Sequence, residues 1–167
     1  MKKKERLTAY QYLLKDKLSG DKNRELIALL KDIKLAGRQV AKELNSATLN
    51  NTIGEMYGKK NTHGEDVKKL DIVANNLFIQ SLENGGNCAG IVSEEKEKVL
   101  IFNNEVSRNS KYLVCIDPLD GSTNIDVNVP VGTIFSVLKR PSLGDKTFSK
   151  DFLQIGSKQV AAGYIIY

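Results

Sequence analysis

The sequence predicts a layered α/β fold in which helices come first and a mixed β-sheet follows. Two early segments repeat apolar residues at helical spacing, and five later runs are short and apolar, as buried strands are. Helices followed by a helix and strand mixture favour layered α/β packing. The 167 residues, 41% of them hydrophobic, suffice for one domain with a core, which we place over residues 1–167.

The first strong helix is predicted over residues 24–45, with Asn23 as its N-terminal cap. Its apolar positions are Leu26, Leu29, Leu30, Ile33, Gly37, Val40 and Leu44. A weaker pattern predicts an earlier helix over residues 8–17. Residues 46–66 are polar and rich in Asn, Thr and Gly, so we expect a loop there.

A second helix is predicted over residues 67–83, and a run of Asn and Gly residues ends it. The strand-like runs follow at residues 88–93, 99–102, 112–116, 133–138 and 160–167. A polar connection covers residues 139–159. Because the chain stops inside the last apolar strand, whose edge and faces need covering, we expect it to be part of a longer protein.

Charge and composition argue against a nucleic-acid partner and against a membrane. The net charge is +5, and residues 1–42 hold 12 basic and 5 acidic side chains. These basic residues are spread around a helix and interrupted by acids, which is typical of a solvated helix, so we expect no nucleic-acid partner. No apolar run could span a bilayer and no signal core follows the N-terminus, so we expect no membrane association and a cytoplasmic location. Without a secretion signal, Cys88 and Cys115 are expected to be reduced, buried thiols.

The most informative stretch is residues 117–124, Asp-Pro-Leu-Asp-Gly-Ser-Thr-Asn, directly after the apolar run at 112–116. Two carboxylates thus appear where a strand is expected to end. Gly121 permits a tight turn, and the three residues after it favour a helix N-terminus. Such a turn offers oxygen ligands for a divalent cation and free backbone N–H groups for an anion. A metal and a phosphate could share it.

Further carboxylates stand at the ends of other elements. Glu94 and Glu95 close one strand-like run, and Glu65 and Asp71 flank the start of the second helix. Ligands collect at strand ends in open α/β sheets. If these groups converge, bound cations must offset their repulsion, and oxygen ligands select Mg²⁺ or Mn²⁺. The alternative is that Glu94 and Glu95 belong only to a charged surface turn.

Four segments resemble class 1 fructose-1,6-bisphosphatases, within the metal-dependent, lithium-sensitive sugar phosphatase superfamily. They match that family in order and spacing, and residues 161–164 are also similar to it. The four segments are residues 64–71, 93–95, 111–126 and 131–136. The resemblance covers nearly the whole chain but only about the N-terminal half of a family member.

The resemblance implies a layered αβαβα sandwich, of which this chain holds the N-terminal helices and a mixed sheet. It also implies Mg²⁺-dependent hydrolysis of the 1-phosphate of fructose 1,6-bisphosphate, a gluconeogenic step that gives fructose 6-phosphate and phosphate. Mn²⁺ is a further candidate metal. The implied metal ligands are Glu94, Glu95, Asp117, Asp120 and the backbone carbonyl of Leu119.

Other residues take roles from the same resemblance. Asp71 and Glu95 would help activate the attacking water, and Glu65 would lie on a loop that closes over the site. The substrate's 1-phosphate would contact residues of the turn, namely Asp120, Gly121, Ser122 and Thr123. Thr123 stands where the family usually has Ser, and both supply a hydroxyl.

A regulatory nucleotide site and a homotetramer are also implied. Glu25, Lys111 and Tyr112 match the AMP-inhibition site of the animal enzymes, whereas Asn23 and Arg24 replace its Thr-Gly pair. From the residues alone, Lys111 and Tyr112 could hold a phosphate by charge and a ring by stacking. Structurally, they only begin a strand.

Two alternatives to a fructose bisphosphatase stay open. The first is a related sugar phosphatase such as one acting on sedoheptulose 1,7-bisphosphate, because the sugar-binding residues of the family lie beyond residue 167. The second is a chain that binds metal or a partner without catalysis.

Overall fold

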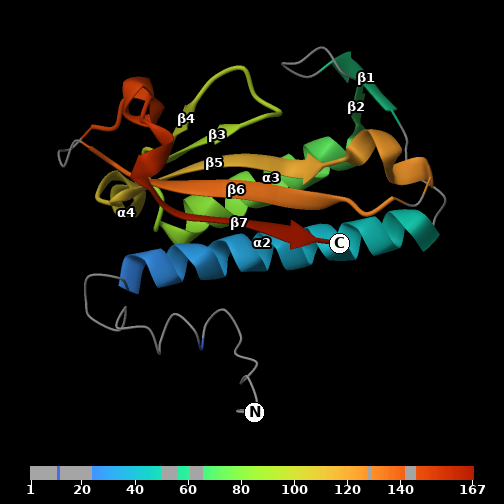
Figure 1. Cartoon of the computed structure of the whole chain (residues 1–167), viewed down its shortest axis with the longest axis horizontal. Coiled ribbons are helices and arrows are strands. Elements are labelled where there is room, and N and C mark those ends of the chain that lie inside the picture. The colour runs from blue at the N-terminus through green and yellow to red at the C-terminus, as the bar shows by residue number, and fades with distance from the viewer. Residues whose placement is uncertain (1–10, 12–23, 50–55, 61–65, 128, 142–145) are drawn as a thin grey trace.

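A computed structural model describes residue 11 and residues 24–49, 56–60, 66–127, 129–141 and 146–167. The chain forms a mixed α/β unit in which two long helices pack on a five-stranded sheet (Figure 1). This arrangement confirms the predicted fold class. The earlier helix predicted over residues 8–17 lies outside the described residues, apart from Gln11.

Helix α2 (Arg24–Leu49) is the long helix that runs below the sheet in Figure 1. It buries the face made by Leu29, Ile33, Ala36 and Val40, which recur at helical spacing. It ends four residues later than predicted, because the apolar repeat continues through the buried Ala47.

Helix α3 (Lys69–Gly85) packs beside α2 and against the sheet, with Phe78 and Leu82 fully buried. The two helices approach closely near the end of α3. Gly85 lies in this contact, and an added Cβ there would need the Asp32 carboxylate on α2 to move aside. A hydrogen bond from Ser81 Oγ to the Asp32 carbonyl, 2.9 Å long, joins the same two helices.

The sheet has the strand order β4-β3-β5-β6-β7. Its members are β3 (Gly90–Ser93), β4 (Leu100–Ile101), β5 (Tyr112–Asp120), β6 (Gly132–Lys139) and β7 (Gln159–Ile166). Only β3 and β5 run parallel, and every other neighbouring pair is antiparallel. The carboxyl ends of β3 and β5 therefore meet at one edge of the sheet.

Alternate residues of the strands face two different apolar clusters. Val114 and Ile116 of β5 face the helices, whereas Leu113 and Cys115 face a smaller cluster closed by Phe152. Phe152 belongs to η3 (Ser149–Phe152), one of two short helical turns before β7; the other is η4 (Gly156–Lys158). On this second face, Ile134, Tyr164 and Ile166 remain largely exposed.

Three local predictions were wrong. The loop predicted over residues 46–66 contains the end of α2 and the strand β1 (Met56–Lys60), which pairs with β2 (Asp66–Lys68). Strand β5 does not end before Asp117 but continues through Asp120. The short helix α4 (Glu105–Arg108) was not predicted; it is one turn long, and Asn104 caps it.

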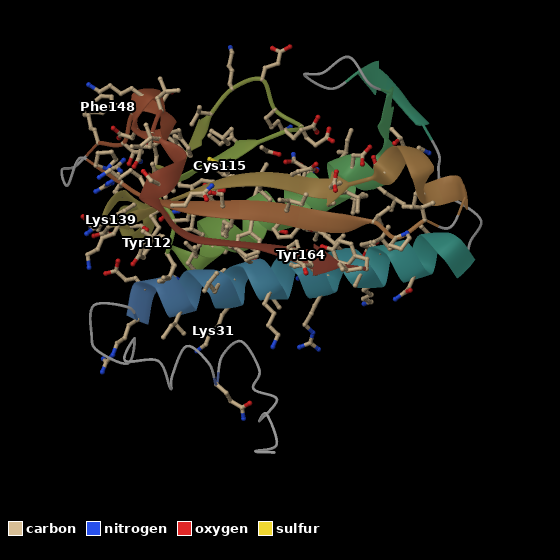
Figure 2. All side chains as sticks on the ribbon, viewed as in Figure 1. Lys31, Tyr112, Cys115, Lys139, Phe148 and Tyr164 are labelled. Carbon is tan, nitrogen blue, oxygen red and sulfur yellow. The ribbon has the colours of Figure 1, made fainter. Side chains whose placement is uncertain are left out.

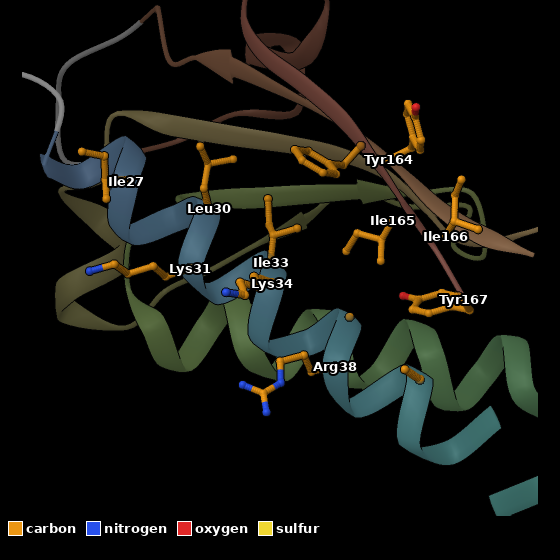
Figure 3. Close-up of a pocket in the computed structure, with 13 residues that line it drawn as sticks. Ile27, Leu30, Lys31, Ile33, Lys34, Arg38, Tyr164, Ile165, Ile166 and Tyr167 are labelled. Carbon is orange, nitrogen blue, oxygen red and sulfur yellow. The ribbon is translucent and has the colours of Figure 1, made fainter. Parts of the chain in front are cut away.

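A groove of about 790 Å³ lies between α2 and β7. Ile165, Ile166 and Tyr167 contribute from the strand, and Lys31, Lys34 and Arg38 contribute from the helix (Figure 3). Gly37 allows this close approach, because an added Cβ would lie 2.5 Å from Ile165 Cδ1. In the described part of the chain, every helix is too short or too polar to cross a bilayer.

Candidate active site at the edge of the sheet

Glu94 and Asp117 lie side by side where β3 ends against β5. Ser93 of β3 and Ile116 of β5 are register partners in the parallel pair, so Glu94 and Asp117 follow at the same level. The Glu94 N–H donates to the Ile116 carbonyl at 3.0 Å, which extends the pairing by one residue. The sheet thus brings the two predicted ligand segments together.

Helix α3 adds a buried carboxylate to this edge. Asp71 is only 2% exposed and lies in the first turn of α3, where the helix dipole favours a negative charge. One turn later, Asn75 accepts a 2.7 Å hydrogen bond from Ser93 Oγ. The Glu95 N–H donates to the same Ser93 oxygen at 3.3 Å. Asn75 and Ser93 therefore fix the β3 turn relative to the helix that bears Asp71.

The carboxylates at this edge are close enough to perturb one another. Burial, the Asp71 charge and a hydrogen bond with Glu94 raise the pKa of Glu95 to about 8. Burial raises the pKa of Asp117 to about 6; the hydrogen bond from the Leu119 N–H opposes that rise, and the charges of Asp120, Glu94 and Asp71 add to it. Five predicted site residues thus share one electrostatic environment, and each would be stabilised by a nearby cation.

The predicted phosphate-binding turn follows directly. Gly121 has φ of +82°, a left-handed conformation that only glycine adopts without strain. A 3-10 helix, η2 (Ser122–Val127), begins at the next residue, so Ser122 and Thr123 form its first turn. Thr123 is exposed and Ser122 is half-buried. This turn lies next to Asp120, the exposed last residue of β5.

The predicted metal ligands suit a hard divalent cation by their chemistry. Every predicted ligand supplies an oxygen atom, and oxygen donors suit Mg²⁺ or Mn²⁺. Among the side chains that the structure places, however, no three of Asp, Glu, His or Cys are close enough to surround one ion. One predicted ligand is not of that kind, because Leu119 would use its backbone carbonyl, and the predicted catalytic residue Glu65 lies outside the described residues. The donor chemistry fits a hard divalent cation, and the complete set stays a prediction.

The predicted nucleotide residues gather at the opposite end of β5. The Lys111 Nζ lies 2.7 Å from the Glu25 Oε1, and both side chains are partly exposed. Tyr112 begins β5 beside them, at the left end of the sheet in Figure 2. The nine residues of β5 separate this group from Asp120 by about 25 Å. A nucleotide there would act at a distance from the carboxylates.

The sequence pattern did not identify four residues that support the site. Asn75, Ser93, Thr133 and Tyr167 bind one another or the backbone near the carboxylates. Their partners lie 15 to 34 residues away, so no local pattern marks them. Asn75 is the one of the four that the sequence could have identified, since it lies four residues after Asp71 on the same helix face.

Comparisons with known proteins concern the family and the fold of the chain. The family model described as fructose-1,6-bisphosphatase, N-terminal domain, matches residues 8–167. The holo form of Leishmania major fructose-1,6-bisphosphatase superposes with a TM-score of 0.83 and 29% identity, over 98% of this chain and 49% of that one. The apo form gives 0.73 and 28%, over 98% and 47%. The chain thus spans about half the length of these solved relatives.

Proposed function

Because the chain belongs to the fructose-1,6-bisphosphatase family, we propose that it carries the metal-binding and phosphate-cleaving part of a sugar bisphosphatase. The reaction is hydrolysis of the 1-phosphate of fructose 1,6-bisphosphate to fructose 6-phosphate and phosphate. The observation that supports this most is the meeting of Asp71, Glu94, Glu95 and Asp117 at one sheet edge.

The chemistry needs a water molecule, a held phosphate and a stabilised leaving group. The water oxygen bonds to phosphorus, the bond between phosphorus and the sugar O1 breaks, and O1 takes up a proton. No covalent bond to the protein is required. The residues must therefore orient water and phosphate and stabilise negative charge.

The chain's own groups match these tasks. Burial and the charge of nearby Asp71 raise the pKa of Glu95 to about 8, so the ionised Glu95 carboxylate is a stronger proton acceptor than an ordinary glutamate. These two carboxyl groups are positioned to orient a water molecule and accept its proton. The turn at Gly121 and Ser122 offers backbone N–H groups for the phosphate oxygens.

The metal would be held by Glu94, Glu95, Asp117, Asp120 and the Leu119 carbonyl. When bound, Mg²⁺ would lower the pKa of water and neutralise phosphoryl charge. The raised pKa values of Glu95 and Asp117 support this assignment, because an added cation relieves the repulsion that helps raise them. Glu65 is proposed to complete the site from outside the described residues.

The test measures phosphate release from fructose 1,6-bisphosphate by the protein expressed from its own gene, with and without Mg²⁺. Asp120→Ala is expected to reduce kcat to below a tenth, because it removes a group proposed to bind both metal and phosphate. Glu97→Ala is the control, since Glu97 is an exposed carboxylate in the neighbouring turn. A protein without Mg²⁺-dependent turnover would contradict the proposal.

The same assay addresses the finer assignments. Sedoheptulose 1,7-bisphosphate, offered in parallel, distinguishes a related sugar bisphosphatase from one that prefers the fructose substrate. We also propose a homotetramer in the cytoplasm, by analogy with the family, and sedimentation of the purified protein tests the assembly. Added AMP tests whether Glu25, Lys111 and Tyr112 form a regulatory site.

A further inference from the structure

Strand β5 contains a bulge at the centre of the proposed site. Asp117 pairs with Ile134 and Asp120 pairs with Gly132, so Pro118 and Leu119 together lie opposite the single residue Thr133. Pro118 has no N–H to offer a neighbouring strand. The pairing between β5 and β6 therefore does not fix the orientation of the peptide between Pro118 and Leu119, and other contacts must do so.

Side chains hold this peptide at both ends. The Thr133 hydroxyl donates to the Pro118 carbonyl at 2.8 Å. The Leu119 N–H, which belongs to the same peptide unit, donates to the Asp117 Oδ1 at 3.1 Å. Because a trans peptide is planar, fixing its carbonyl also fixes the direction of its N–H. Thr133 thus acts through one rigid peptide on the carboxylate of Asp117.

Tyr167 extends the chain of hydrogen bonds. Its hydroxyl lies 2.6 Å from the Thr133 Oγ1, and Thr133 itself is fully buried. The Thr133 hydroxyl has one hydrogen and donates it in the hydrogen bond to the Pro118 carbonyl. In the hydrogen bond between Thr133 and Tyr167, the Tyr167 hydroxyl must therefore be the donor. The order is therefore Tyr167 to Thr133 to Pro118. Tyr167 directly follows β7, beside α2 (Figure 3).

We propose that Thr133 and Tyr167 are positioning residues that orient the Pro118–Leu119 peptide and, through it, the Asp117 carboxylate for metal binding. The proposal rests on the proposed function, since it assigns a role toward the same metal. It also gives Thr133 a task that an apolar residue of equal shape could not perform. No contact of either side chain with the metal is implied.

The experiment measures the Kd for Mn²⁺ of the protein expressed from its own gene, by electron paramagnetic resonance of free Mn²⁺. Thr133→Val keeps the shape and removes the hydroxyl, and is expected to weaken binding about three- to tenfold, the value of one net hydrogen bond. Thr133→Ser restores the hydroxyl and is expected to return the Kd to within about twofold of wild type.

Ser81→Ala is the matched control. It also removes a hydroxyl that donates to a backbone carbonyl, but between α3 and α2 near the far end of α3. It is expected to lower thermal stability without changing the Kd for Mn²⁺. An equal loss of affinity in Ser81→Ala and Thr133→Val would assign both effects to general destabilisation and overturn the proposal.

A second variant and a second readout cover the case in which Thr133→Val does not fold. Tyr167→Phe keeps the bond from Thr133 to Pro118 and is expected to weaken Mn²⁺ binding about twofold. The second readout is amide hydrogen exchange at Leu119, measured without added metal. Exchange is expected to be faster in Thr133→Val than in the wild type, and faster to a smaller extent in Tyr167→Phe. Unchanged exchange at Leu119 would contradict the proposal.

Failure of the two proposals can be told apart. If the wild-type chain binds no Mn²⁺, the proposed metal site is wrong and this inference falls with it. If the wild type binds Mn²⁺ and Thr133→Val binds it equally well, only the positioning role is wrong.

Discussion

Asp117 shows how one residue of the site opposes the stability of the fold. Its side chain is half-buried, and burial together with the charges of Asp120, Glu94 and Asp71 raises its pKa to about 6. Near neutral pH it is therefore largely ionised against unfavourable surroundings. Such a residue is suited to a bound cation and unsuited to an empty site.

Replacing Asp117 with Asn is therefore expected to stabilise the metal-free chain. Asn keeps the oxygen that accepts from the Leu119 N–H but removes the charge. After allowance for solvent screening, the gain in the free energy of unfolding at pH 7.5 is about 1 kcal/mol. Urea denaturation in EDTA measures it. With Glu97→Gln as the exposed control, a loss of stability in Asp117→Asn would refute the explanation.

At this scale the sequence identified the ionisable residues but not their supports. Asp71, Glu94 and Asp117 stand out because they are carboxylates at the ends of apolar elements, where open α/β sheets collect ligands. Thr133 does not stand out, since a threonine in a strand is ordinary. Its role depends on the bulge that places Pro118 and Leu119 opposite it, which only the paired strands reveal.

Among the elements, β6 and β7 pack closely against each other near the site. Gly132 is the first residue of β6 and pairs with Asp120 on one side and Ile166 on the other. A Cβ on Gly132 would collide with the backbone carbonyl of Ile165. A backbone atom in a paired strand cannot move aside as the end of a side chain can.

Gly132→Ala is accordingly expected to lower the free energy of unfolding by about 2 kcal/mol, within the usual range for overpacking. Gly156→Ala is the matched control, because nothing lies within 4 Å of an added Cβ there. Thermal denaturation of both variants provides the comparison. Equal stability of the two would show that β7 is not held at this distance from Gly132.

Strands with apolar sequences were predicted correctly, whereas strands with polar sequences were not. All five strands of the main sheet were expected, because each falls on a short run of apolar residues in the sequence. The β1 and β2 pair was not expected, since residues 46–66 are polar and contain no apolar run of strand type. The continuation of β5 past Ile116 was also missed, because the prediction placed a turn at the two aspartates.

For the whole molecule, the shared charge of the site predicts a pH dependence of stability without metal. The folded pKa of Glu95 is about 8 and that of Asp117 about 6, both above the ordinary values of 4.5 and 3.8 for these side chains. Each group therefore favours folding when protonated, and this contribution is lost as the pH rises through the folded pKa. The free energy of unfolding attributable to these groups should fall between about pH 4 and pH 8.

The difference between wild type and Glu95→Gln isolates this effect from other titrating groups. Urea denaturation in EDTA from pH 5 to pH 8 should show a steeper fall for the wild type than for the variant. Added Mg²⁺ should reduce the fall, because a cation favours the ionised carboxylates. A wild type that gains stability relative to Glu95→Gln as the pH rises would contradict the assigned shifts.

The central claim is that the carboxylates at the ends of β3 and β5 form a divalent-metal site. Its most direct test is a Mn²⁺ titration of the chain by electron paramagnetic resonance, with Mg²⁺ as competitor. We expect at least one bound Mn²⁺ that Mg²⁺ displaces, and binding at least about tenfold weaker in Asp117→Asn, since a charged ligand is lost. No binding by the wild type, or equal binding by Asp117→Asn, would contradict the claim.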